Sequence, residues 1–125
     1  MVIGVLQFEL LVPGSHSLKD KRRVVKSLKD RLHREHLISI AEVEALDHHR
    51  LAVMGLSVVS NSAAYAGGVL DRVVEKLKAV RDARLGQVRR EILTGEAWSG
   101  SADDLWSEEE RRADEPAPGA GGEPA

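Results

Sequence analysis

The segment VIGVLQFELLVPGSHSLKDKRRVVKSLKDRLHRE, residues 2–35, decides the fold because its periodicity changes across one short turn. From Val2 to Val12 one side of the chain is apolar at every second residue and the other side is mixed, which is typical of a strand. Pro13-Gly14 ends that strand. Ser17 then caps an expected helix over Leu18–Glu35, where apolar residues recur at helical spacing.

Two further strands are predicted downstream of this helix. Leu37–Ala45 and Arg50–Ser60 are rich in Val, Ile, Leu and Ala, and Asp47-His48-His49 lies between them. This short polar connection indicates a hairpin, although it lacks the glycine of the tightest turns.

A second helix and a last strand complete the predicted elements. Asn61 or Ser62 can cap the helix, and Gly67-Gly68 within it should weaken its first turns by very roughly 1 kcal/mol per glycine. Its apolar stripe consists of Ala66, Val69, Leu70, Val73, Leu77 and Val80. Leu85–Leu93 predicts the last strand.

The order strand, helix, strand, strand, helix, strand predicts an α+β protein with a ferredoxin-like βαββαβ sandwich over residues 1–94. Right-handed crossovers place both helices on one face of a four-stranded antiparallel sheet. The other face of that sheet is expected to be open to solvent or to a partner.

The composition changes from Gly95 onward. Residues 1–95 hold 16 Lys/Arg against 11 Asp/Glu, whereas residues 96–125 hold 2 against 9, which gives net charges of +5 and −7. We expect the acidic, Pro/Gly/Ala-rich residues 95–125 to be mostly disordered, because they cannot bury enough apolar surface. Trp98, Leu105 and Trp106 are the exception, either as a short docking helix or as exposed side chains without a role.

Composition also limits the chemistry. The chain has no cysteine, which removes disulfides, thiolate catalysis and Cys-based zinc sites. No apolar run approaches the roughly 20 residues that span a bilayer, and Met1–Val12 lacks the basic start of a signal peptide. We therefore expect a cytoplasmic protein without membrane association.

Basic residues dominate the first helix. At about 100° per residue, most of them fall on the arc opposite the apolar stripe or flank that arc. They therefore form an outward cationic ridge. The predicted nucleic-acid-binding residues are Lys19, Arg22, Arg23, Lys26, Lys29 and Arg34. Such a ridge suits RNA or DNA, although a solvated helix face that keeps the protein soluble has the same composition.

The turn Gly14–Ser17 offers a second kind of site. It precedes a helix N-terminus, where free N–H groups attract anions, so Ser15 and Ser17 are candidate anion-binding residues. The alternative is that Ser17 only caps the helix. The turn is not a P-loop, because GxxxxGK[ST] is absent.

Other polar residues do not predict a catalytic, cofactor or metal site. Adjacent side chains in Asp47-His48-His49 point apart in an extended hairpin, which favours a hydrated loop. Glu42 and Glu44 are two apart and are expected to share a strand face, open or paired with Arg89 or Arg90. Phe8 alternates onto the core side, so the open face lacks the aromatics on which RNA bases stack.

Four segments carry a resemblance. They are VIGVLQFEL at Val2–Leu10, PGSHSLKDKRRVVKSL at Pro13–Leu28, SIAEV at Ser39–Val43 and MGLSVVSN at Met54–Asn61. Together they resemble the YlxP-like family of small bacterial proteins, a domain of unknown function, over about residues 1–94. The resemblance implies a ferredoxin-like fold and a gene neighbourhood that often includes transcription and translation factors, and hence a role in RNA or ribosome biology. No catalytic residue is established for that family, so none is carried over.

Three functional hypotheses follow. The first is a small, non-enzymatic binding protein that contacts RNA or the ribosome through the first helix. The second is a phosphorylated-ligand-binding protein or acylphosphatase-like enzyme at the Gly14–Ser17 turn, although the catalytic arginine loop is not found. The third is a homodimer or larger assembly formed through the open sheet face, with the acidic tail shielding the basic helix.

Overall fold

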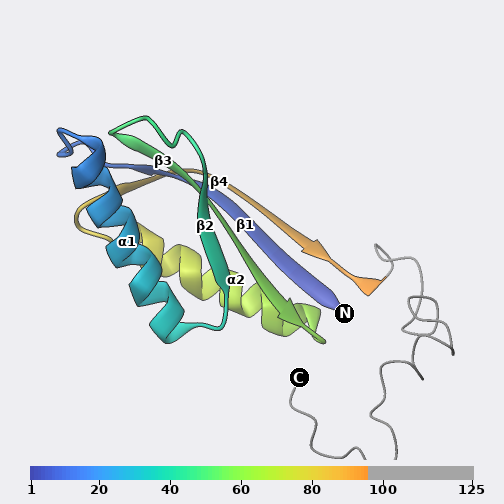
Figure 1. Cartoon of the computed structure of the whole chain (residues 1–125). Helices are drawn as coiled ribbons and strands as arrows, with labels where there is room; N and C mark the ends of the chain where they lie inside the picture. Colours follow the sequence, from blue (N-terminus) through green and yellow to red (C-terminus); the bar gives the residue numbers. More distant parts are fainter. Residues whose placement is uncertain (96–125) are drawn as a thin grey trace, which may run out of the picture. The chain divides into compact units, whose positions relative to one another are not determined.

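The computed structural model describes residues 1–95, and these residues contain four strands and two helices. In chain order they are β1 (Val2–Leu11), α1 (Leu18–Glu35), β2 (Ser39–Glu44), β3 (Leu51–Ser60), α2 (Ala63–Lys78) and β4 (Arg84–Leu93). Figure 1 shows both helices on the same side of the sheet. The predicted tail and its docking segment around Trp98, Leu105 and Trp106 lie outside the described residues.

All strand pairs in the sheet are antiparallel, and the strand order is β2-β3-β1-β4. The two central strands are therefore β1 and β3, while β2 and β4 form the edges. This arrangement confirms the predicted ferredoxin-like α+β sandwich.

The core lies between the sheet and the helices. Strand β1 buries Leu6, Phe8 and Leu10 on one face, as its alternation predicts, and Phe8 is only 1% exposed. Directly paired residues share a face, so Leu56 and Met54 of β3 lie beside Leu6 and Phe8 in the same core. The helices complete it with Val25, Leu28, Leu32, Ala66, Val69, Leu70, Val73 and Leu77.

The predicted element boundaries hold closely except at β2. This strand begins at Ser39 rather than Leu37, whose side chain is 91% exposed. It ends at Glu44, because Ala45 adopts a φ of 59° and turns the chain. Ser17 caps α1 as predicted, since its Oγ accepts from Asp20 N. Of the two candidates for the cap of α2, Ser62 takes the role, and its Oγ accepts from Tyr65 N.

Glycines play different roles in β1 and in α2. A Cβ at Gly4 would lie 2.9 Å from Val58 Cγ1 and 3.3 Å from Leu70 Cδ1, so glycine lets α2 approach the sheet. Helix α2 continues unbroken through Gly67-Gly68, because its apolar stripe is anchored in the core on both sides of the pair.

Among residues 1–95, no helix is both long enough and apolar enough to span a membrane.

Candidate nucleic-acid interface

The six predicted nucleic-acid-binding residues lie together on α1. We call Lys19, Arg22, Arg23, Lys26, Lys29 and Arg34 the basic ridge. All except Lys29 are exposed, and Lys29 is partly buried. The opposite side of the helix buries Val25, Leu28 and Leu32, so packing against the sheet turns the ridge outward.

Most of the ridge has no acidic partner within residues 1–95. Only Lys26 does: its Nζ lies 2.8 Å from Asp30 Oδ2, and this hydrogen bond lowers the pKa of Asp30. The other five cations make no ion pair within this part of the chain. The ridge therefore keeps most of its positive charge available to an anionic partner.

Lys21, which the sequence places within the same basic block, lies on the other side of the helix. Its side chain is fully buried, and its Nζ lies 2.7 Å from Glu42 Oε2. The same ammonium group donates to the backbone carbonyl oxygens of Ala45, Leu46 and Leu51, at 2.9, 3.2 and 3.2 Å. Lys21 is therefore not an outward cation, and it is not one of the six predicted ridge residues.

The helical spacing could have revealed this difference. Lys21 precedes Val25 by four residues and Leu28 by seven, so it lies within the apolar stripe rather than opposite it. A lysine buried there needs a carboxylate and further acceptors, which β2 and the β2–β3 connection supply. Lys21 thus joins α1 to this hairpin and is not a surface cation.

Glu42 and Glu44 do not share a strand face, contrary to expectation. The pairing of β2 with β3 shifts register between them, because Val43 adds an extra residue. Glu42 therefore faces α1 and pairs with Lys21, not with Arg89 or Arg90. Glu44 instead lines a shallow depression of about 300 Å³ on the open sheet face, together with Gln7 and Arg89.

The turn before α1 satisfies its own polar groups. Ser15 is 2% exposed, and its hydroxyl donates to the Ser17 carbonyl oxygen at 2.9 Å. The Asp20 carboxylate accepts from His16 N at 3.0 Å, and Ser17 Oγ accepts from Asp20 N at 3.1 Å. The chain thus already places a carboxylate at this helix N-terminus. The geometry favours capping, and anion binding by Ser15 and Ser17 stays a prediction.

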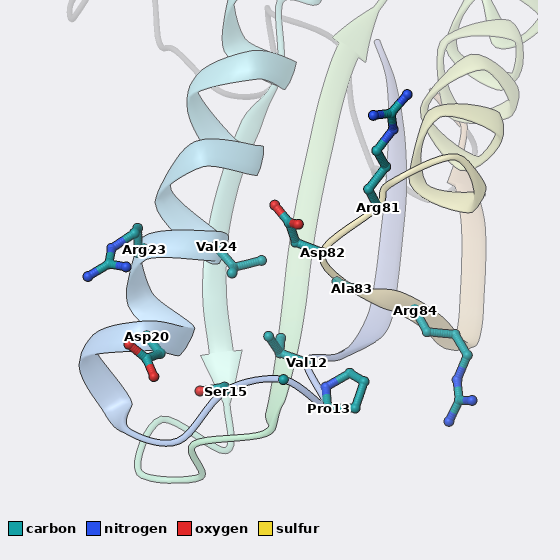
Figure 2. A pocket seen from close by; sticks show the side chains of 11 residues that line it. Val12, Pro13, Ser15, Asp20, Arg23, Val24, Arg81, Asp82, Ala83 and Arg84 are labelled. Carbon is teal, nitrogen blue, oxygen red and sulfur yellow. The ribbon is translucent and has the colours of Figure 1, made fainter.

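A cavity of about 680 Å³ opens beside this turn, between α1 and the connection from α2 to β4. We call it the α1 cleft. It is lined by Val12, Pro13, Gly14, Ser15, Asp20, Arg23, Val24, Arg81, Asp82, Ala83 and Arg84. Figure 2 shows Val12 and Val24 facing the space, Asp82 reaching across it toward α1, and the arginine side chains extending outward. Sequence reasoning missed this cleft because its two walls are about 60 residues apart.

A cluster of charged and polar side chains joins the C-terminal ends of the two helices. Lys76 Nζ lies 2.6 Å from Glu35 Oε2 and 2.7 Å from His36 Nε2. Burial and the nearby Lys76 charge lower the pKa of His36, while hydrogen bonds from Lys76 and Arg31 lower that of Glu35. A neutral His36 with an unprotonated Nε2 can accept a hydrogen bond from the Lys76 ammonium group, so this cluster fastens α1 to α2.

The histidines of the β2–β3 connection do not assemble a metal site. The rings of His48 and His49 stack 6.0 Å apart, and His48 Nδ1 accepts from Arg50 N. Within residues 1–95 no group of three His, Cys, Asp or Glu side chains has the arrangement that could hold a metal ion.

The fold and the basic ridge describe a small α+β protein with a ferredoxin-like sandwich. The chain belongs to the family described as "Protein of unknown function (DUF503)", whose model matches residues 3–90. No curated protein matches the chain. Among solved structures it is similar to a de novo designed protein with a ferredoxin fold, determined by solution NMR. The two are 18% identical with a TM-score of 0.44, covering 82% of this chain and 94% of the designed one.

Proposed function

We propose that this chain is a small, non-enzymatic binding protein that contacts RNA, on the ribosome or elsewhere, through the basic ridge of α1. One observation carries the proposal: five of the six ridge cations make no ion pair within residues 1–95, and they occupy one continuous outward face. A contiguous cationic face attracts a polyanion and releases its condensed counterions on binding.

RNA is favoured over other polyanions by the sequence resemblance. We propose that the finer YlxP-like naming applies to this chain, and with it the association with transcription and translation factors. A cytoplasmic location belongs to the same proposal.

The open sheet face has no exposed aromatic side chain among residues 1–95, so the ridge, rather than the sheet, is the proposed contact.

The alternatives have less support from the geometry. A phosphorylated ligand at the Gly14–Ser17 turn would compete with the Asp20 carboxylate already placed there. A homodimer through the open sheet face would bury Glu9, Arg89 and Glu91 beside its apolar residues, and burying such charges is costly unless they are paired.

Charge removal tests the proposal. The ridge variant changes Lys19, Arg22 and Arg34 to Gln, and the matched control changes Arg72, Lys78 and Arg89 to Gln. Both variants lose three positive charges, but only the first loses them from the ridge. We expect the ridge variant to bind a structured RNA at least tenfold more weakly than the control at low salt, because each lost phosphate contact reduces affinity. Equal filter-binding curves for the two variants would contradict the proposal.

The acidic segment 96–125, with its net charge of −7, is proposed to shield the ridge. Deleting it should tighten RNA binding most at low salt, where charge–charge attraction is least screened. Equal affinities of the full and shortened chains would rule out the shield and leave the ridge proposal standing.

A further inference from the structure

We propose that the α1 cleft accepts an unstacked nucleobase, guanine in preference to uracil, from the RNA strand that the basic ridge binds. This inference rests on the proposed function and deepens it, because it names single-stranded or looped RNA as the ligand. Continuous duplex would keep its bases stacked and leave the cleft empty.

The cleft and the ridge are physically continuous. Arg23 belongs to the ridge and also lines the cleft, so a strand held by the ridge passes the cleft opening. A second depression of about 420 Å³ continues the cleft along α1 and shares Val24, Arg81 and Asp82 with it. A bound strand therefore has room to continue along α1 from the proposed base site.

The lining suits a base better than a phosphate. Val24 and Ala83, which are partly buried, supply apolar contacts for a flat ring above the buried Val12, and the volume of about 680 Å³ lies in the range of small-molecule sites. The carboxylates of Asp20 and Asp82 would repel a phosphate placed inside. Figure 2 shows the arginines directed outward, where the sugar–phosphate backbone would run.

Asp82 supplies the preference between bases. Its side chain is exposed, reaches toward α1 and makes no ion pair within residues 1–95, so its oxygens are available as acceptors. Guanine presents two adjacent N–H donors on its Watson–Crick edge, which match the two oxygens of a carboxylate. Uracil presents one N–H between two carbonyl oxygens, and those oxygens would face the carboxylate unfavourably.

Two experiments test this inference. In the first, the ¹⁵N-labelled full chain is titrated with guanosine 5′-monophosphate, uridine 5′-monophosphate and inorganic phosphate. We expect the guanosine nucleotide to shift the amides of residues 12–15, 24 and 82–84 at lower concentration than the uridine nucleotide. Inorganic phosphate should leave them unchanged. Equal shifts from phosphate alone would identify an anion site and overturn the inference, as would the absence of any shift.

The second experiment fills the cleft with Val24→Trp, and the control Val59→Trp adds the same ring on the open sheet face. Val24→Trp should weaken binding of a single-stranded RNA about tenfold, the scale of one lost base contact, and leave binding of a blunt duplex unchanged. The ridge variant should instead weaken both RNAs. If the ridge variant weakens both while Val24→Trp weakens neither, the base site is wrong and RNA binding by the ridge survives. The nucleotide titration uses the wild-type chain, so it decides the matter even if Val24→Trp fails to fold.

Discussion

Replacing Lys21 with Met should destabilise the fold far more than replacing its exposed neighbour. Lys21 is 0% exposed, and its ammonium group satisfies Glu42 and three backbone carbonyl oxygens of the β2–β3 hairpin. Met fills a similar volume and removes only the charge and the donors. The substitution therefore measures the polar contacts rather than a cavity.

The magnitude follows from what is left behind. Glu42, whose side chain is 14% exposed, would keep a nearly buried charge without a partner. Removing one member of a buried pair costs about 3–5 kcal/mol. For a domain of this size each kcal/mol lowers Tm by about 4–8 °C, so Tm should fall by at least about 12 °C. Arg22→Met, which removes one exposed charge, should change stability by less than about 0.5 kcal/mol.

Urea unfolding of the full chain, followed by far-UV circular dichroism, measures both variants. The double variant Lys21→Met/Glu42→Leu removes the unpaired carboxylate as well, so it should recover part of the stability lost in Lys21→Met. Equal stability of Lys21→Met and Arg22→Met would show that Lys21 is a surface cation and would refute the assigned contact with β2.

Two further predictions concern pH and the glycines. The pKa of His36 lies below its ordinary value of 6.5 because of burial and Lys76, so the unfolded chain binds more protons at mildly acidic pH. The stability from this group is therefore present above about pH 6.5 and is lost as pH falls through the folded-state pKa. His36→Gln should flatten the dependence of the unfolding free energy between about pH 5.5 and 8, and an unchanged slope would contradict this assignment. Gly4→Ala should destabilise the fold by about 1–3 kcal/mol because its Cβ would meet β3, whereas Gly67→Ala, whose Cβ has ordinary room, should stabilise α2 by about 0.5–1 kcal/mol. Thermal unfolding with the opposite order of the two variants would refute the packing assigned to them.

The fold was predictable from the sequence because each element carries a strong local signal. The alternation in β1, the helical stripe of α1 and the caps Ser17 and Ser62 are all properties of neighbouring residues. The end of β2 was less predictable, since it depends on a register shift and on the positive φ of Ala45, which the pattern of residue types does not show.

The candidate site was predictable only in part. The exposed face of α1 follows from its hydrophobic period, so the placement of the ridge residues could be expected. Lys21 carries the same charge as the ridge residues, but it was not among the six predicted, and its position in the apolar stripe indicates burial. The α1 cleft depends on how α1 lies against the α2–β4 connection, and tertiary packing of distant segments leaves no local signature.

The central claim is that RNA contacts the outward face of α1, and mapping the binding surface by NMR tests it most directly. The ¹⁵N-labelled full chain would be titrated with a hairpin RNA at low and at moderate salt. We expect the perturbed amides of residues 1–95 to concentrate in α1 and beside the α1 cleft, and the shifts to diminish as salt is raised. Perturbations confined to the open sheet face, or no perturbation at low salt, would contradict it.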